Sequence, residues 1–379
     1  MRGRRDATMR RLDNPALLAA ARQDPVSFVV DDGLLVVDEV QRAPEIMLPL
    51  KARVDAERRP GQFLLTGSAR LLGLRLLPDA LVGRTETIEL WPFSQGELTD
   101  GSDGFVDAAF ADRPEFMSSG ASSRADVIER ALRGGFPEAV RRDATRRSRF
   151  FASYVGDLLD RDVVQLSDIH RRADLDRLLR LLASRMATPL NVESVASELG
   201  VPRATVERYI ALFEEVFLIK RIPAWSTSGT RRATRARKLM FVDTGLAGHL
   251  IGASAARVAR DARLAGQVVE NFALGELARQ LGWATEPVHL LHYRTRDGEE
   301  VDAVLEHNDG RVVGIEVKAA ATVDADDFRH LHHLRSRVPE RFHLGIVLYS
   351  GSDVLAFGDG MVAAPLDVLW TSAVPPSLS

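Results

Sequence analysis

The spacing of apolar and polar positions changes several times along the chain, and each change predicts a different element. Residues 34–37 (Leu-Leu-Val-Val) form an unbroken apolar run, which is typical of a strand buried on both faces of a parallel sheet. Residues 43–57 carry apolar side chains at every fourth position and predict a helix, and residues 63–65 (Phe-Leu-Leu) predict a second buried strand. Strand, helix and strand in this order indicate a parallel crossover unit.

Polar side chains follow both predicted strands. Asp38 and Glu39 end the first strand, and Thr66-Gly67-Ser68 ends the second. The carboxyl ends of parallel strands meet at one edge of a sheet, which is where open α/β sheets bind ligands. An Asp at this edge can hold Mg²⁺ and a following Glu can orient a water. The simpler alternative is a strand that enters a solvated turn.

Other patterns divide the chain further. A short helix is expected over Asn14 to Arg22, since Asn14 can serve as its N-cap. The Gly-, Ser- and Asp-rich residues 99–123 predict a surface excursion or a domain boundary, and helical periodicity follows over 125–185. Two short helices and a strand over 191–225 give a winged-helix-like pattern, which suits either DNA binding or a packing role.

Composition limits the classes of protein and partner. The 379 residues carry a net charge of −3 and no cysteine, which excludes disulfides and thiolate metal sites and fits a cytoplasmic protein. No apolar run is long enough to span a bilayer, so no membrane partner is expected. Binding to nucleic acid must then be local, and the basic run Arg231 to Lys238 is its candidate, with a solvated loop as the alternative.

Lysine is scarce in this chain. Of the 50 basic residues only four are lysines, and the remainder are arginines. A lysine in a chemically suggestive position is therefore informative. The four are Lys51, Lys220, Lys238 and Lys318.

The C-terminal part brings acidic residues together with one of these lysines. The Asp297-Gly298 pair predicts a tight turn, which places Asp302 on the return strand of a hairpin. In residues 315–318 (Ile-Glu-Val-Lys), strand alternation puts Glu316 and Lys318 on one face. Two carboxylates from neighbouring strands can hold Mg²⁺, and a lysine beside them can position or deprotonate a water.

Several motifs in the N-terminal part occur in a characteristic order and together resemble a large prokaryotic family of AAA-type ATPases. The motifs are the runs 36–44, 63–70, 81–84 and 90–94. The resemblance makes the first run a Walker B strand and the second a sensor strand. It implies ATP and Mg²⁺ as cofactors, with Asp38 on Mg²⁺, Glu39 orienting the attacking water, Thr66 or Ser68 sensing the γ-phosphate and Arg84 stabilising charge.

The chain departs from that family in one respect. A P-loop needs the pattern Gly-x-x-x-x-Gly-Lys-Ser/Thr, and the only glycines before Asp38 are Gly3 and Gly33. The chain thus resembles a family member that lacks its phosphate-binding unit, through a misplaced gene start, a truncation or degeneration. We expect this polypeptide by itself to bind ATP poorly and to show no measurable hydrolysis.

The C-terminal pattern also carries a resemblance. Asp302 followed by Glu316-x-Lys318 resembles the restriction-endonuclease-like (PD-(D/E)XK) nucleases, with Glu270 matching their helical acid. It also resembles the domain of unknown function that accompanies this ATPase family. The resemblance implies Asp302 and Glu316 as metal ligands, and Glu270 and Lys318 as catalytic residues. A retained but inactive scaffold is the alternative.

These observations predict an α/β protein in three parts. Residues 1–120 form a partial parallel-sheet ATPase domain, 121–250 a helical and winged-helix-like region, and 251–379 a restriction-endonuclease-like α/β domain. The expected function is that of an AAA-type ATP-binding protein with a nuclease-like domain acting on nucleic acid. The alternative is a non-catalytic interaction or regulatory protein that keeps both folds. An oligomer is compatible with the sequence.

Overall fold

The chain folds into two compact units. A computed structural model describes residues 7–67, 81, 83–120, 122–160, 172–227, 236–358 and 360–373. The first unit comprises residues 1–88 and 215–217, and the second comprises residues 89–214 and 218–379. The three-part division of the sequence at residues 120 and 250 stays a prediction.

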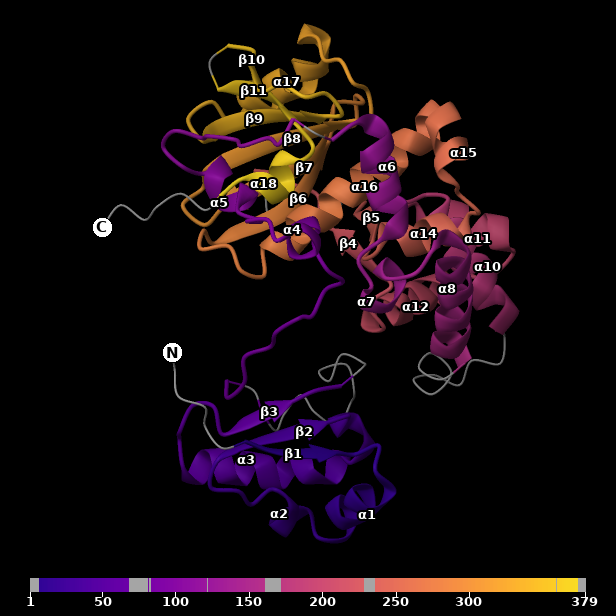
Figure 1. Ribbon diagram of the computed structural model, residues 1–379, viewed down its shortest axis with the longest axis vertical. Coiled ribbons are helices and arrows are strands. Elements are labelled where there is room, and N and C mark those ends of the chain that lie inside the picture. The colour runs from indigo at the N-terminus through magenta and orange to yellow at the C-terminus, as the bar shows by residue number, and fades with distance from the viewer. Residues whose placement is uncertain are drawn as a thin grey trace. The chain divides into compact units, whose positions relative to one another are not determined.

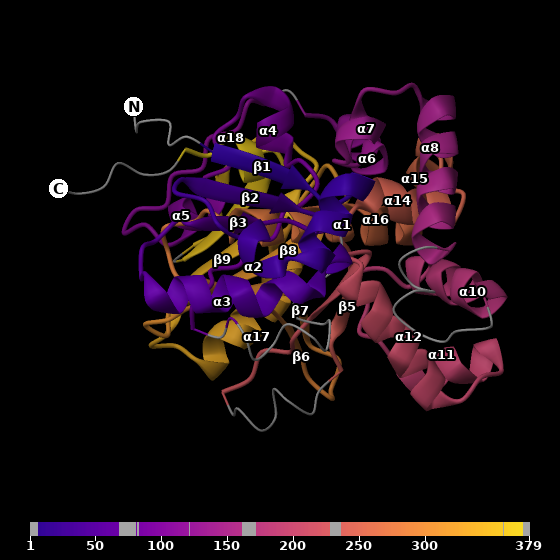
Figure 2. The ribbon, with the colours of Figure 1, turned by 90° about the horizontal axis from the view of Figure 1, so that it is seen from below.

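The first unit is a three-stranded parallel sheet with helices (Figure 1). Strand β2 pairs with β1 on one side and with β3 on the other, and Figure 2 shows the three strands side by side. The predicted parallel crossover is therefore confirmed. The elements are β1 (Ala7–Arg11), α1 (Pro15–Gln23), α2 (Pro25–Phe28), β2 (Leu34–Asp38), α3 (Met47–Ala56) and β3 (Phe63–Leu65), with 3₁₀ turns at Val40–Arg42 and Pro44–Ile46.

Strand β2 differs from its prediction in its burial. Leu35 and Val37 are fully buried against the helices, whereas Leu34 and Val36 are half-buried. The expectation of a strand buried on both faces was wrong for this unit. The reason is that the core of the unit gathers on one face of the sheet, so only alternate side chains of the apolar run enter it.

The boundaries of the first helices follow local chemistry. Asn14 caps α1 as expected, because its side chain accepts hydrogen bonds from the amides of Ala16 and Leu17. Helix α3 begins at Met47 rather than at Ala43, since a 3₁₀ turn takes the preceding residues. Strand β1 had no apolar pattern in the sequence because most of its residues are exposed.

The second unit begins with a predominantly helical part. It contains α4 (Gln95–Thr99), α5 (Phe105–Ala109), α6 (Arg124–Arg133), α7 (Pro137–Val140), α8 (Ala144–Leu158), α10 (Arg172–Ala183), α11 (Val192–Leu199), α12 (Arg203–Glu215), α14 (Thr244–Leu250) and α15 (Ala255–Arg260). A small antiparallel pair, β4 (Ile219–Ile222) and β5 (Lys238–Phe241), lies between α12 and α14 in the sequence. The predicted helix pair over residues 191–215 is confirmed, whereas the winged-helix assignment stays a prediction.

Residues 99–123 are not simply a surface excursion. Helix α5 lies within this stretch and is buried along its whole length, including the side chain of Asp107. That carboxylate accepts hydrogen bonds from the amides of Thr285 and Glu286. The polar composition of the stretch therefore reflects buried polar contacts as well as solvent exposure.

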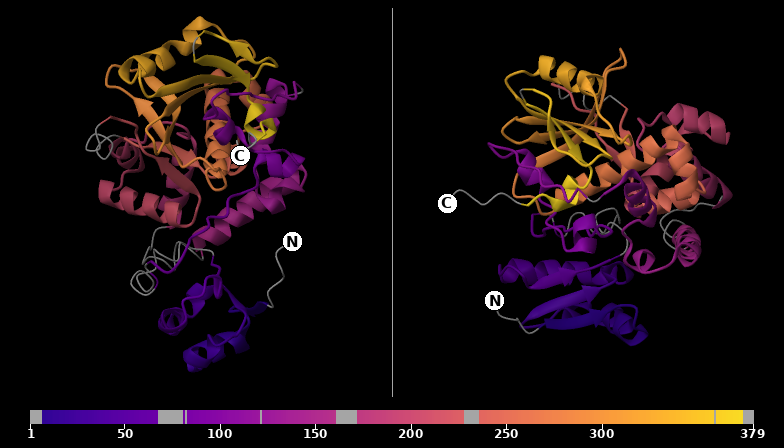
Figure 3. Two further views of the ribbon diagram at one scale, coloured as in Figure 1. Left: turned by 90° about the vertical axis from the view of Figure 1, so that its left-hand side faces the viewer. Right: turned by 45° about the horizontal axis from the view of Figure 1, so that its top comes forward.

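The C-terminal part of the second unit is a mixed six-stranded sheet with helices. The strand order is β10-β11-β9-β8-β7-β6, and these strands, coloured orange to yellow, lie side by side in Figure 3. Pairs β6–β7 and β7–β8 are antiparallel, and β8–β9 is parallel. The predicted α/β fold class is confirmed. The elements are α16 (Ala262–Gln280), β6 (Val288–Arg294), β7 (Glu300–His307), β8 (Val312–Lys318), the 3₁₀ turn Ala325–Phe328, α17 (Arg329–Arg337), β9 (Phe342–Tyr349), β10 (Leu355–Ala356), β11 (Met361–Pro365) and α18 (Val368–Thr371).

None of the helices within the described ranges has both the length and the apolar character that crossing a lipid bilayer requires.

Candidate functional site

The acidic end of β2 lies next to the end of β3, as the sequence predicted. The Thr66 hydroxyl donates a hydrogen bond to Oδ1 of Asp38, and the Thr66 amide donates to the Val37 carbonyl at 2.9 Å. The two strand ends are therefore held together by both main-chain and side-chain contacts. Their arrangement offers carboxylate and hydroxyl oxygens, which are the ligand type that Mg²⁺ prefers.

Glu39 has an unusual backbone conformation. Its φ of 57° lies in the left-handed region, which residues other than glycine rarely adopt. Its carboxylate accepts a hydrogen bond from the Gln41 side chain. Strained backbone of this kind costs about 1 to 3 kcal/mol and is often found at functional sites.

Arg84, which was also predicted to act on the nucleotide, has a partner elsewhere in the unit. Arg84 forms an ion pair with Asp55 of α3, with 2.6 Å between Nε and Oδ1. Ser68 lies outside the described residues. Asp38, Glu39 and Thr66 therefore lie at the two neighbouring strand ends, whereas Arg84 pairs with a residue of α3.

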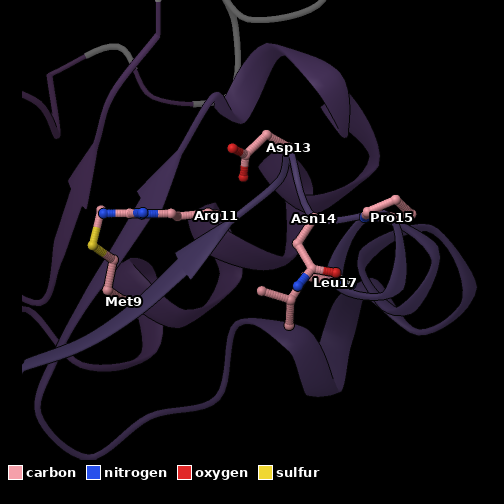
Figure 4. Close-up of a pocket in the computed structure, with 6 residues that line it drawn as sticks. All are labelled: Met9, Arg11, Asp13, Asn14, Pro15 and Leu17. Carbon is pink, nitrogen blue, oxygen red and sulfur yellow. Dashed lines mark hydrogen bonds between the residues drawn. The ribbon is translucent and has the colours of Figure 1, made fainter.

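A surface pocket lies at the end of β1 and the start of α1 (Figure 4). One of its polar members is engaged locally, since the Asn14 side chain caps α1. Neither Asp38 nor Glu39 lines it, so this pocket is separate from the acidic strand end. The six lining residues are Met9, Arg11, Asp13, Asn14, Pro15 and Leu17.

A second group of acidic residues gathers in the C-terminal sheet. The turn at Gly298, which has a φ of 94°, connects β6 to β7 and places Asp302 on the return strand. Ala303 pairs with Ile315 across β7 and β8, so the adjacent Asp302 and Glu316 lie at the same end of the two strands. Helix α16 contacts β8 and carries Glu270. The local turn and the strand alternation thus position the acids as the sequence predicted.

A lysine lies among these acids. The Nζ atom of Lys238 is 2.6 Å from Oε1 of Glu270, 3.3 Å from Oδ1 of Asp302 and 3.4 Å from Oε1 of Glu300. Burial opposes the charge on Lys238, but the three carboxylates together raise its pKa above the ordinary value. Lys238 is therefore a charged group in the centre of the site, and Glu300 is a further member that the sequence analysis missed.

Glu316 is the least satisfied member of the group. Only 4% of the residue is exposed, and among the described residues its Oε1 atom has no hydrogen-bond partner. Its other oxygen lies 3.8 Å from Nζ of Lys318, which is also 3.5 Å from Oδ1 of Asp327. Burial, with the charge of Asp302, raises the pKa of Glu316 well above its ordinary value. We call Glu270, Glu300, Asp302, Glu316, Lys238 and Lys318 the carboxylate–lysine cluster.

The electrostatics of the cluster are set by burial. Burial, with the charge of Asp302, raises the pKa of Glu270 to about 8, although Lys238 opposes the shift. Asp302 is held in place because its Oδ2 atom accepts a hydrogen bond of 2.9 Å from the amide of Val317. The site therefore combines carboxyl groups of raised pKa with a charged amine, a combination that can take part in proton transfer.

The cluster does not fit a bound Mg²⁺ as it stands. Within the described part of the chain, no three Asp, Glu or His side chains are placed to hold a metal ion together. The reason is visible in the contacts of Lys238, whose ammonium lies between Glu270 and Asp302. Carboxylate oxygens suit Mg²⁺, but the position between them is occupied by the ammonium group of Lys238.

The basic run differs from its sequence interpretation at its last residue. Residues 228–235 lie outside the described part, so most of the run, including Arg231, stays a prediction. Lys238 is fully buried in β5, and therefore it is not part of an exposed basic surface. The physical reason is its ion pairing with acids that are distant in the sequence. The scarcity of lysine was the one signal that could have separated it from the neighbouring arginines.

Helix α16 also carries a buried ion pair that the sequence analysis missed. Arg279 donates to the carbonyls of Pro92 and Val242 at 2.9 and 3.1 Å and lies 2.8 Å from Oε1 of Glu276. The other oxygen of Glu276 accepts from the amide of Gln95 at 2.9 Å. These contacts bind the start of the second unit to the helix that positions Glu270.

Comparison with known families divides the chain into three matched segments. Residues 4–99 match an AAA domain (AAA_14). Residues 124–257 and residues 265–369 match two domains of unknown function, DUF8612 and DUF4143. These matches support an AAA-type family. Residues 4–99 are thus similar to an AAA domain, and the acidic strand end lies within this segment.

Two mycobacterial relatives align with most of the chain. Uncharacterized proteins of Mycobacterium bovis and of Mycobacterium tuberculosis are each 26% identical to it over 343 residues. The aligned region covers 90% of this chain and 70% of each relative. No solved structure matches the chain significantly.

Proposed function

We propose that this chain is an AAA-type ATPase-family protein whose C-terminal domain cleaves phosphodiester bonds in nucleic acid. The AAA match implies the use of ATP and Mg²⁺ by the first unit. In that unit we assign Mg²⁺ binding to Asp38, orientation of the attacking water to Glu39 and sensing of the γ-phosphate to Thr66. The contact between Asp38 and Thr66 and the left-handed backbone of Glu39 support these roles.

The cleavage proposal is carried by one observation. Glu270 from α16, Asp302 from β7, and Glu316 and Lys318 from β8 come together in the carboxylate–lysine cluster, although they are distant in the sequence. This is the set of residues that resembles the PD-(D/E)XK nucleases. In such a site Lys318 stabilises or positions the attacking water, and the acids accept its proton.

The proposed substrate is a nucleic acid because of the chemistry of the site and its surroundings. A phosphodiester offers the negative charge that Lys318 and Arg294, the cations at the rim of the cluster, can bind. We propose that the sugar–phosphate backbone of the nucleic acid contacts the basic run that begins at Arg231. Lys238 takes no part in this contact because it is buried. On the predicted recognition helix α12, Arg203 is already paired with Glu193 and Glu207, which disfavours sequence-specific binding by that helix.

Cleavage of single- and double-stranded DNA and RNA, with and without Mg²⁺, tests the proposal. The wild-type protein should cleave at least one of the four substrates, and Lys318→Ala should slow that cleavage on the order of 100-fold. Lys51→Ala serves as the matched control, since Lys51 lies on α3 in the other unit and should leave the rate unchanged. Equal inactivity of the wild type and Lys318→Ala would favour the non-catalytic interaction protein instead.

A further inference from the structure

Lys238 is an unusual residue because of where its charge lies. It is the first residue of β5, pairs with Ile222 across the small sheet and has no exposed surface. A buried ammonium is costly unless carboxylates surround it. The chain has only four lysines, and one of them lies at this buried position. This indicates that a positive charge is required there.

The contacts of Lys238 resemble those of a bound cation. Its Nζ atom lies within 3.4 Å of oxygens from Glu270, Asp302 and Glu300, and it also donates to the carbonyl of Asp302 at 3.3 Å. Three carboxylates and a carbonyl that converge on one point form a set of hard oxygen donors. In this protein the set is directed at an amine.

The acids of the cluster outnumber its cations even after Lys238 is counted. The acids of the cluster are Glu270, Glu300, Asp302 and Glu316. At its rim, Arg294 pairs with Glu300, and Lys318 lies near Glu316. Among the described residues Glu316 Oε1 is buried without a hydrogen-bond partner, in a residue that is only 4% exposed. An orphaned carboxylate oxygen of this kind indicates that the cluster can accept a further positive group.

We propose that Lys238 is the resident cation of the carboxylate–lysine cluster and competes with divalent metal ions for its oxygens. The ammonium neutralises part of the charge and takes the position between Glu270 and Asp302 that a metal would need. Lys238 therefore sets the metal affinity of the site as a positioning residue. This inference concerns the site of the proposed nuclease function, but its test is the binding of metal rather than cleavage.

Titration with Mn²⁺, followed by electron paramagnetic resonance of the free ion, measures this competition directly. The wild-type protein should bind Mn²⁺ weakly, and Lys238→Met should bind it on the order of tenfold more tightly or better, because one positive charge has left a low-dielectric site. Methionine keeps the unbranched shape of the lysine side chain. The additional substitution Glu316→Gln should remove the gain.

Lys220→Met is the matched control. Lys220 lies on β4 of the same small sheet and pairs with Glu89, away from the cluster acids, so this variant should bind Mn²⁺ like the wild type. Unchanged Mn²⁺ affinity in folded Lys238→Met would overturn the proposal. If that variant does not fold, the wild type decides: tight Mn²⁺ binding that Glu316→Gln abolishes would overturn it, and weak binding would support it.

The failure of this inference can be told apart from the failure of the proposed function. A gain of Mn²⁺ affinity in Lys238→Met without cleavage by any form would keep Lys238 as the resident cation and reject the nuclease. Cleavage that depends on Lys318, with Mn²⁺ affinity unchanged in Lys238→Met, would support the nuclease and reject Lys238 as the resident cation.

Discussion

Arg279→Ala is expected to lower the free energy of unfolding by about 3 to 5 kcal/mol, which is the usual cost of breaking a buried ion pair from one side. Arg279 is 4% exposed, and its guanidinium satisfies Glu276 together with two carbonyls. Without it, Glu276 is a buried carboxyl group that has lost its cation, and its pKa, which burial already raises to about 7, rises further. Urea unfolding followed by circular dichroism measures the change.

The control for Arg279 is an arginine with a similar local partner but an exposed position. Arg180 pairs with Asp176 four residues earlier on α10, and its side chain is 53% exposed. Arg180→Ala should cost no more than about 1 kcal/mol. Similar losses in the two variants would mean that burial of the Arg279 pair does not determine its contribution.

Glu316→Gln is expected to separate stability from activity. Removing the charge of a buried carboxylate with an orphaned oxygen should leave stability unchanged or raise it by roughly 1 to 2 kcal/mol, while cleavage is lost. The pKa of Glu316 in the folded state lies above the ordinary value of 4.5. Its destabilising effect is therefore absent below pH 4.5 and grows as the pH rises, so the gain should be larger at pH 8 than at pH 5. Urea unfolding at both pH values measures it.

Glu276→Gln is the matched control for Glu316→Gln. Both residues are almost fully buried, but Glu276 has Arg279 and the Gln95 amide as partners. At pH 8 the substitution at 276 should destabilise the protein, since it leaves the charge of Arg279 without its partner. A loss of stability in both variants would show that Glu316 has a structural role.

Local chemistry accounts for what the sequence predicted correctly. The N-cap at Asn14, the turn at Gly298 and the alternation that places Glu316 beside Lys318 each depend on residues a few positions apart. Asp38 and Thr66 could be predicted as neighbours because parallel strands end at one edge of a sheet.

Long-range contacts account for what the sequence could not predict. Lys238 meets Glu270 and Asp302 across 32 and 64 residues, and Arg279 reaches the carbonyl of Pro92 across 187. No periodicity connects such positions, so the basic run appeared uniform although its last residue is buried. The one-sided burial of β2 was missed for a related reason, since an apolar run does not reveal which face its helices cover.

The most direct measurement of whether the carboxylate–lysine cluster is one catalytic centre compares cleavage by wild type, Asp302→Asn, Lys318→Ala and the double variant. Residues that act as a unit give non-additive losses. We therefore predict that each single substitution removes nearly all cleavage and that the double variant is no slower than the slower single one. Losses that multiply in the double variant, or a wild type that cleaves no faster than buffer, would contradict a single phosphodiester-cleaving centre.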